Sequence, residues 1–444
     1  MGKLFGTDGV RGKANEELTP ELAMKLGEAT SNFARKGEKV FIGRDTRRSG
    51  GMFKSALESG MASHGLDVID LGIVPTPAVP FLGKEKEMDL GAVISASHNL
   101  AGDNGIKFFD SRGFKIPIAW EEKIENFVFN NVDSKVPGRE IGQIYREKKL
   151  KRQYVDRLLK KIVPKNFSTG LKLVIDCANG ANYKLGPLLF DKVGVDTTCI
   201  NTEPNGDNIN LNCGSTNMES ISRHVVDDGA DLGVAFDGDG DRALFVDEKG
   251  ELVDGDHVLY IAANWLQEKG LLQPKTVVST VMSNLGFEKS LDRKGIKLIR
   301  TKVGDRFVAN QMEKKDFALG GEQSGHIIFR DVGTTGDGLA TALKILVILT
   351  ETGEKLSTLK KPLLRYPQVL ENVEVTRKDL FNLEGKIGEK VNSWQDKLGE
   401  EGRVLVRASG TQPVIRVMVE SKIENIANRA AQDIATTVDS KLNP

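Results

Sequence analysis

The pattern of apolar and polar positions in residues 1–150 predicts short strands that alternate with helices. A helix is expected after Thr19, which would be its N-cap, with Pro20 at the first helical position. Its apolar face consists of residues at helical spacing, namely Leu22, Leu26, Ala29 and Phe33. Buried-type strands are predicted at 40–42, 68–71 and 92–94. This alternation indicates crossover connections and therefore a mainly parallel α/β sheet.

The rest of the chain continues this alternation and changes character near its end. Polar, aperiodic stretches at 132–149 and 360–367 are predicted to be linkers. After the second linker the pattern predicts a smaller unit of strand, helix, two strands and a final amphipathic helix. A chain of 444 residues is too long for a single core. Length therefore suggests three or four domains. The two linkers, and a helix that is expected to open a new α/β unit near Asp254, divide the chain at 1–150, 151–254, 255–366 and 367–444.

Composition narrows the kinds of partner. The 62 basic and 62 acidic residues cancel, so no bulk charge attracts nucleic acid or an anionic membrane. Cys177, Cys199 and Cys213 form no CxxC pair, which indicates neither a zinc site nor a disulfide framework. No apolar run reaches the roughly 20 residues that span a bilayer, and the first residues lack a signal-peptide core. We expect a cytoplasmic protein without nucleic-acid or membrane partners.

One turn-rich connection, between apolar runs that end at Ile94 and begin at Ile106, concentrates chemically useful groups. It holds two serines and a base, His98, which follows Ser97, and a cation, Lys107, lies just beyond it after Ile106. A hydroxyl becomes a nucleophile or a phosphate carrier when such groups lie close to it. The same residue types also build ordinary turns, so this stretch alone leaves both interpretations open.

Three carboxylates follow directly on an apolar strand, at Asp237, Asp239 and Asp241. The glycines between them let the backbone bend, so the carboxylates can converge on one hard cation, and without it they would repel. A calcium EF-hand shares this spacing and would use Glu248 at its twelfth position. Its sixth position must be glycine, however, and here it is Arg242, while strands instead of helices are predicted on both sides. A strand-end Mg²⁺ site is therefore preferred.

Two further loops suit a phosphorylated polyol. Residues 320–326 place Glu322, Gln323 and Ser324 between glycines, where they could recognise hydroxyls or an amine, although a plain polar turn is the alternative. Residues 407–416, between two predicted strands, combine hydroxyls, arginines and backbone amides around a glycine, as a phosphate cradle does. A solvated hairpin is the alternative there. The phosphate-binding candidates are Arg407, Ser409, Gly410, Thr411 and Arg416.

Together the four loops resemble those of the α-D-phosphohexomutases, in that family's order and over essentially the whole chain. The resemblance implies three similar mixed α/β domains and a smaller α+β C-terminal domain around a central cleft. Ser97 would be the phosphoserine, and Mg²⁺ would be bound by that group and the three aspartates. Residues 5–12 and Gln323 look like the branch that acts on glucosamine phosphates, with the phosphomannomutase/phosphoglucomutase branch as the alternative. Substrate contacts are expected from Thr7, Arg11, Glu322, Ser324 and the phosphate-binding candidates above.

The resemblance also implies the reaction. The phosphoserine would phosphorylate glucosamine 6-phosphate at O1. The sugar 1,6-bisphosphate would turn round, return its other phosphate to the serine and leave as glucosamine 1-phosphate, for amino-sugar nucleotide synthesis of the bacterial envelope. Arg242 would neutralise charge on the transferred group. The candidate bases are Lys107, His326 and His98, and the family favours Lys107 assisted by His326, with Arg242 and His326 lowering the lysine pKa. His98 would mainly position the serine loop. A homodimer is also implied.

Some residues depart from the family pattern or have no assigned role. The departures, expected to affect rate or loop order, are Leu100, Asn217 and Gln412. The remaining histidines are expected on surfaces without partners, namely His64, His224 and His257. Two other functions stay open: a Mg²⁺-dependent phosphatase that uses the same serine and aspartates, and a calcium-binding protein without catalytic activity.

Overall fold

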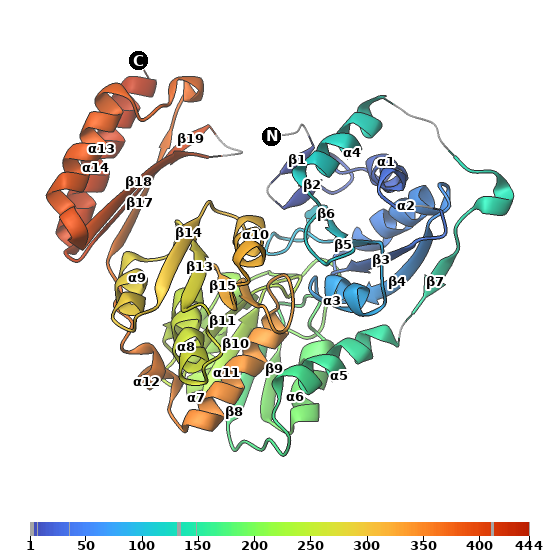
Figure 1. The fold of residues 1–444 in the computed structure, drawn as a ribbon, viewed down its shortest axis with the longest axis horizontal. Coiled ribbons are helices and arrows are strands. Elements are labelled where there is room, and N and C mark those ends of the chain that lie inside the picture. Colours follow the sequence, from blue (N-terminus) through green and yellow to red (C-terminus); the bar gives the residue numbers. More distant parts are fainter. Residues whose placement is uncertain are drawn as a thin grey trace. The chain divides into compact units, whose positions relative to one another are not determined.

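The computed structural model describes residues 4–6, 8–34, 36–130, 135–147, 149–409 and 413–443. It consists of two compact units, one formed by 1–282 and 296–361 and the other by 283–295 and 362–444. Among the described residues, the first unit contains three β-sheets and the second contains one (Figure 1). Within the described ranges, no helix combines the length and apolar character needed to cross a bilayer.

The first sheet has seven strands in the order β1-β2-β6-β5-β3-β4-β7. Their bounds are β1 (Phe5–Gly6), β2 (Gly9–Lys13), β3 (Lys39–Arg44), β4 (Asp67–Ile73), β5 (Leu90–Ile94), β6 (Asp103–Asp110) and β7 (Ile144–Arg146). The pairings along β5-β3-β4-β7 are parallel, whereas those along β1-β2-β6-β5 are antiparallel. The prediction of a mainly parallel sheet is therefore wrong. The sheet is mixed because β6 returns from β5 through a short loop instead of a helix.

The predicted linker at 132–149 is also corrected, because it contains β7. This strand pairs in parallel with β4 at the edge of the first sheet. Its Ile144 and Tyr145 side chains are 45% and 46% exposed. A strand that is exposed on both faces shows no alternation of apolar and polar residues, so its sequence resembles a linker.

Helices α1 (Pro20–Ala29), α2 (Gly50–Ala62), α3 (Ala78–Glu85) and α4 (Ile118–Asn130) accompany this sheet. The predicted N-cap of α1 is confirmed, since Thr19 Oγ1 accepts the Leu22 N–H at 3.2 Å and Pro20 begins the helix. Residues of α1, α2 and α4 pack with the sheet in one core. Its fully buried members include Leu26, Phe53, Leu57, Ile42 and Ala92. This core fixes the frame from which the β5–β6 loop projects.

The other two sheets of the first unit are also mixed. Their orders are β12-β11-β10-β8-β9 and β14-β13-β15-β16. The strands are β8 (Lys172–Asp176), β9 (Asp196–Ile200), β10 (Leu232–Phe236), β11 (Ala243–Asp247), β12 (Leu252–Val253), β13 (Thr276–Thr280), β14 (Lys297–Thr301), β15 (Leu319–Gly321) and β16 (Ile327–Phe329). The helices are α5 (Leu150–Ile162), α6 (Leu185–Val193), α7 (Glu219–Asp227), α8 (Gly255–Glu268), α10 (Asp305–Lys315), α11 (Gly338–Thr352) and α12 (Leu356–Lys360).

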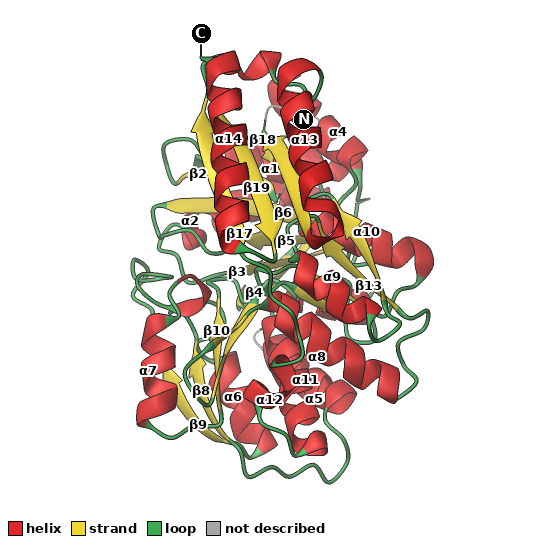
Figure 2. Cartoon of the chain, turned by 90° about the vertical axis from the view of Figure 1, so that its left-hand side faces the viewer, coloured by secondary structure: helices red, strands yellow, loops and turns green. Residues whose placement is uncertain are grey.

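The second unit carries the antiparallel sheet β17-β19-β18. Its strands are β17 (Gln368–Glu374), β18 (Gly402–Ala408) and β19 (Val414–Ser421), and its helices are α9 (Leu285–Asp292), α13 (Gly385–Leu398) and α14 (Glu424–Leu442). Figure 2 shows α13 and α14 side by side along this sheet. The predicted order of strand, helix, two strands and helix is confirmed. On α14, Ala427, Ile434 and Val438 are buried in the core of this unit, whereas Ile426 is exposed, as is the N-cap residue Ile423.

Helices α1 and α2 pack so closely that their backbones touch at two glycines. A Cβ on Gly60 would lie 2.1 Å from the Met24 carbonyl oxygen, and one on Gly27 would lie 2.4 Å from that of Leu57. Overpacking at such a contact shifts the backbone and costs ~1–3 kcal/mol. We predict that Gly60→Ala lowers the free energy of unfolding by that amount in chemical denaturation.

Gly51→Ala is the matched control, because Gly51 lies in the same helix and a Cβ there would meet nothing within 4 Å. Helix propensity should leave this variant unchanged or stabilise it by up to ~1 kcal/mol. Equal losses at the two positions would contradict the packing argument.

A buried carboxyl joins α5 to α11. Asp337 is the N-cap of α11, accepts the Ala340 N–H at 3.0 Å and accepts the Tyr154 hydroxyl of α5 at 2.6 Å. Burial raises the pKa of Asp337 from 3.8 to about 6, against the opposing effect of these hydrogen bonds. A carboxyl whose pKa is raised by folding destabilises the fold once it ionises. The cost is absent below pH 3.8, grows up to about pH 6 and is constant above it.

We therefore predict that Asp337→Asn gains stability relative to the unsubstituted protein as pH rises. From the two pKa values, the difference in unfolding free energy should move toward the asparagine variant by ~2 kcal/mol between pH 4.5 and 7.5. Urea unfolding at both pH values measures this change. A difference that is independent of pH would show that Asp337 titrates normally.

Candidate active site

The serine loop connects β5 to β6 and buries the hydroxyl that the sequence singled out. Ser97 is 1% exposed and adopts a left-handed backbone conformation with φ of +53°. Its Oγ donates to Asp237 Oδ2 at 2.6 Å and lies 3.4 Å from His98 Nδ1. The loop from the first sheet thus meets the aspartate loop from the second.

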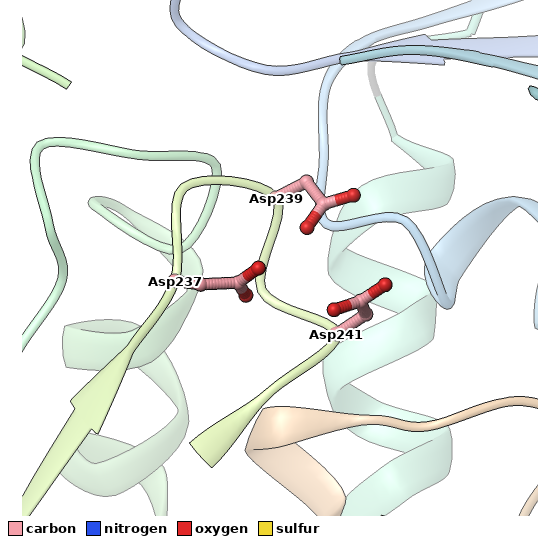
Figure 3. Close-up of side chains that lie close together, drawn as sticks. All are labelled: Asp237, Asp239 and Asp241. Carbon is pink, nitrogen blue, oxygen red and sulfur yellow. The ribbon is translucent and has the colours of Figure 1, made fainter. Parts of the chain in front are cut away.

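The aspartate loop is the turn between β10 and β11, which pair antiparallel. The predicted strands on both sides are confirmed, and this excludes the helical flanks of an EF-hand. Glu248, the twelfth residue of that alternative, accepts a hydrogen bond from Ser357 instead. Figure 3 shows Asp237, Asp239 and Asp241 on the one turn, and one oxygen from each lies within 4.8 Å of the others.

The three carboxylates are buried together, and their free oxygens fit a cation. Asp239 Oδ2 accepts Thr76 Oγ1 at 2.6 Å and Lys107 Nζ at 2.8 Å, so its second oxygen is available. The Oδ1 atoms of Asp239 and Asp241 are buried and accept no hydrogen bond from the described residues. Burial, and then the neighbouring carboxylates, raise the pKa of Asp237 well above its usual range. A divalent cation would bind the free oxygens and relieve this repulsion.

Lys107 is a buried counter-charge to the aspartate loop. It is 1% exposed, and its Nζ lies 3.0 Å from Asp8 Oδ2 and 3.6 Å from Asp241 Oδ2, in addition to its bond with Asp239. Burial alone would lower the pKa of Lys107, but these three carboxylates outweigh it and raise the pKa above its ordinary value. The expectation that cationic neighbours lower this pKa is therefore wrong, because carboxylates are the nearer groups.

Arg242 and His98 form the rim of the aspartate loop. The Arg242 backbone N–H donates to Asp237 Oδ1 at 3.2 Å, and its Nη1 donates to His98 Nδ1 at 3.2 Å. Burial, followed by the Arg242 and Arg11 guanidinium groups, lowers the pKa of His98 to about 4. The ring is therefore neutral at pH 7, and its Nδ1 lone pair faces Arg242.

His326 faces the same carboxylates from the loop before β16. Its Nδ1 lies 3.6 Å from Asp241 Oδ2, and its Nε2 accepts the Gly336 N–H at 2.9 Å. A ring nitrogen that accepts a hydrogen bond carries a lone pair, so this contact favours the neutral ring with its proton on Nδ1. Burial would lower the pKa of His326, but the carboxylates, Asp241 first, raise it overall. The geometry suits a group that exchanges a proton.

A cavity of about 190 Å³ lies among these side chains. It is lined by Asp8, Arg11, His98, Asp241, Arg242, Val303, Gly304, Asp305, Glu322 and His326. The predicted substrate residues Arg11 and Glu322 therefore reach the same space, and Ser324 lies two residues beyond Glu322. Glu322 Oε1 accepts the Gly304 N–H at 3.3 Å, and burial raises its pKa. Thr7 lies outside the described residues.

Sequence reasoning missed four residues that belong to this cluster. Asp8 pairs with Lys107 and with Lys115, and Lys115 Nζ also pairs with Asp305 Oδ2 at 2.6 Å. Thr76 Oγ1 donates a hydrogen bond to Asp239 Oδ2 in the aspartate loop. Asp8 lies in a loop whose glycine spacing was a usable signal, whereas nothing local to Thr76 or Asp305 indicates their partners.

The predicted phosphate loop lies in the second unit, between β18 and β19. Arg407 and Arg416 stand directly opposite each other on these strands. Like charges in that arrangement repel, and burial together with Arg416 lowers the pKa of Arg407. Arg416 Nε is buried and donates to no described residue. A bound anion would offset the repulsion between the two arginines and accept the hydrogen bond of Arg416 Nε. Ser409 begins the loop that would hold it. Gly410, Thr411 and Gln412 lie outside the described residues.

The expectation that the remaining histidines are surface groups without partners is corrected. His64 is 5% exposed and bonds the Gly60 carbonyl oxygen, and His257 is 8% exposed with its Nδ1 2.6 Å from Asp254 Oδ1. His224 Nδ1 bonds the Ser220 carbonyl oxygen. Short-range bonds of this kind, within a helix or at its ends, leave no periodic sign in the sequence.

Known proteins match this chain over its whole length. The family Phosphoglucomutase/phosphomannomutase matches through its alpha/beta/alpha domains I, II and III at residues 2–135, 152–250 and 254–366, and through its C-terminal domain at 370–437. A protein of Alkaliphilus oremlandii named phosphoglucosamine mutase is 46% identical over 451 residues, which is 100% of both chains. One of Carboxydothermus hydrogenoformans with the same name is 47% identical, over 99% of this chain and 100% of that one.

A solved structure shares the fold. The Phosphoglucomutase/phosphomannomutase family protein of Burkholderia thailandensis has a TM-score of 0.83 and 24% identity, and the match covers 99% of this chain and 97% of that one. This likeness supports the architecture of mixed α/β sheets described above.

We predict that a divalent cation raises the thermal midpoint of the protein through the aspartate loop. A ligand at about 100 times its Kd adds ~2.7 kcal/mol to the stability of the folded state. Asp241→Asn should remove most of this response, because it neutralises a buried ligand. Thermal denaturation with chelator, with Mg²⁺ and with Ca²⁺ measures the effect.

Glu248→Gln is the control, since an EF-hand would need this carboxylate whereas a site formed by the three aspartates does not. It should keep the full response to the cation. Loss of the response in Glu248→Gln with retention in Asp241→Asn would contradict the assignment.

Proposed function

The chain belongs to the phosphoglucomutase/phosphomannomutase family, and from this membership and its site we propose that it interconverts glucosamine 6-phosphate and glucosamine 1-phosphate. The observation that carries the proposal is the 2.6 Å contact between Ser97 Oγ and Asp237 within a cluster of three buried carboxylates. The name phosphoglucosamine mutase of full-length relatives at 46–47% identity supports the choice of sugar.

Mg²⁺ is the proposed cation. It would be bound by Asp237, Asp239, Asp241 and the phosphorylated Ser97, because hard carboxylate and phosphate oxygens are its preferred ligands. When bound, it would stabilise the negative charge of the phosphoryl group that is being transferred. Arg242, whose side chain lines the cavity, would add a guanidinium to the same charge.

The proposed reaction consists of two transfers that mirror each other. In the first, the bond between phosphorus and Ser97 Oγ breaks while a bond to O1 of glucosamine 6-phosphate forms. The sugar hydroxyl gives up its proton, and the serine oxygen takes one up. The resulting 1,6-bisphosphate reorients, and its 6-phosphoryl group returns to Ser97. Because the second transfer reverses the first, a group that accepts a proton in one must return it in the other.

Lys107 and His326 are the proposed carriers of that proton. Both face Asp241, and His326 also lines the cavity. Lys107 begins as an ammonium ion, so it would give a proton to the departing Ser97 oxygen and take up the proton that the sugar hydroxyl releases. His98 has its Nδ1 occupied by Arg242 and is proposed to position the serine loop. In the same cavity, Arg11 and Glu322 are proposed to contact the sugar phosphate, and Ser324 and Thr7 are proposed from the sequence.

The remaining proposals rest on the sequence. Arg407, Ser409, Gly410, Thr411 and Arg416 are proposed to bind the phosphate that does not react. The opposed arginines of the second unit support an anion there. A homodimer is also proposed, as the resemblance implies, and a cytoplasmic location is proposed from the composition.

Ser97→Ala is predicted to abolish turnover of glucosamine 6-phosphate, because it removes the group that carries the phosphoryl. Peptide mapping of the unsubstituted protein should find one labile phosphate, on Ser97. Turnover should be compared for glucosamine, N-acetylglucosamine, glucose and mannose 6-phosphates, with glucosamine 6-phosphate preferred. Full activity of Ser97→Ala would refute the mechanism, and stoichiometric release of inorganic phosphate would identify a phosphatase instead.

A further inference from the structure

Arg47 is a fully buried arginine whose donors are all used on the serine loop and its support. Its side chain is 0% exposed. Nη2 donates to the Ser97 carbonyl oxygen at 3.0 Å and to that of Asn99 at 2.7 Å. Nη1 donates to the Leu100 carbonyl oxygen and, at 3.0 Å, to that of Asp103. A guanidinium offers five N–H groups, and four of them hold one loop.

The fifth donor connects Arg47 to the same loop by a second route. Nε donates to Asp45 Oδ2 at 2.9 Å, and that oxygen also accepts the Ser95 hydroxyl at 2.6 Å. Ser95 Oγ in turn accepts the Ser97 N–H at 2.9 Å. Both the N–H and the carbonyl of Ser97 are thus fixed by groups that converge on Arg47.

Asn210, in the connection between β9 and α7, bonds two of the same carbonyl oxygens. Its Nδ2 donates to the Ser97 and Asn99 carbonyl oxygens, both at 2.9 Å. The aspartate loop touches this point as well, because a Cβ on Gly238 would lie 2.7 Å from the Ser97 carbonyl oxygen. The Ser97 carbonyl oxygen therefore accepts hydrogen bonds from Arg47 and Asn210, and the backbone at Gly238 packs against it.

We propose that Arg47, assisted by Asn210, is the positioning residue that holds Ser97 in its left-handed conformation and aims its hydroxyl at Asp237. A non-glycine residue with positive φ is strained and persists only where its surroundings impose it. Arg47 supplies that constraint through backbone carbonyls, and it is not among the residues that line the cavity. It therefore acts on the reaction through Ser97 and not through the substrate. This role rests on the proposed phosphoryl transfer.

The arrangement also explains why the unusual Leu100 is tolerated. Its side chain is 56% exposed and its carbonyl is held by Arg47. The order of this loop comes from the guanidinium, which bonds backbone carbonyls, so it does not depend on which side chain stands at position 100.

Arg47→Lys is the direct test, because lysine keeps the charge but offers three donors instead of five. Misplacement of a reacting group by ~1 Å costs on the order of 100-fold in rate. We expect kcat for glucosamine 6-phosphate to fall by about 10–100-fold with KM changed by less than about twofold. Amide hydrogen exchange in residues 97–103 should accelerate, while exchange in the core strands stays unchanged.

Arg48→Lys is the matched control. Arg48 is the next residue, yet its side chain is 73% exposed and pairs with the exposed Asp207. It should keep kcat and loop exchange at the unsubstituted values. Asn210→Ala tests the same carbonyls if Arg47→Lys fails to fold. Combined with Arg47→Lys, it should reduce kcat by less than the product of the single effects, because both residues hold Ser97 and Asn99.

The inference is overturned if Arg47→Lys or Asn210→Ala keeps kcat within twofold and leaves loop exchange unchanged. It is also overturned if Arg48→Lys loses as much activity as Arg47→Lys, or if KM alone rises. Absence of turnover in the unsubstituted protein would instead refute the proposed function, and the exchange measurement would still test the restraint of the loop.

Discussion

Three carboxylates are buried on a single turn, and the arrangement of the charged groups around them depends on this one constraint. Charge that cannot reach water must be matched by charge or by hydrogen bonds nearby. Lys107 supplies one cation, with its Nζ 2.8 Å from Asp239 Oδ2, and Arg242 supplies another, with its Nε 3.9 Å from Asp241 Oδ1. Asp8 and Lys115 extend the alternation of charges outward. The oxygens left without a partner define where a further cation would bind, so protein counter-charges and metal ligands form one electrostatic system.

Close backbone approach makes this system compact. The serine and aspartate loops project from different sheets, yet Gly238 leaves room for the Ser97 carbonyl and Asn210 bonds the same atom. Each loop also belongs to a tight antiparallel connection, β5–β6 or β10–β11, whose ends are fixed by strand pairing. A hydroxyl mounted in this way loses little further entropy when it reacts, which is the advantage of a preorganised site.

Local signals predicted the elements that satisfy themselves locally. The N-cap at Thr19, the strands around the aspartates and the order of elements in the second unit were predictable because capping and burial patterns are written in neighbouring residues. The edge strand β7 was missed because both its faces are exposed. The mixed first sheet was missed because strand direction depends on a connection that periodicity does not describe. Thr76, Asp8 and Arg47 were missed because their partners lie far away in the chain.

The sequence by itself determined which chemical groups this protein has and the local turns that carry them. The spacing of Asp237, Asp239 and Asp241 places three carboxylates on one bend, whatever surrounds it, and the glycines between them permit that bend. Tertiary structure alone decided their charge and their neighbours. It brought Asp8 and Asp239 to Lys107, so that the lysine pKa is raised where a lowered pKa was expected. It also brought the Arg47 guanidinium to the Ser97 carbonyl oxygen. Electrostatic and hydrogen-bond energies depend on distance in space, and separation along the chain does not set that distance.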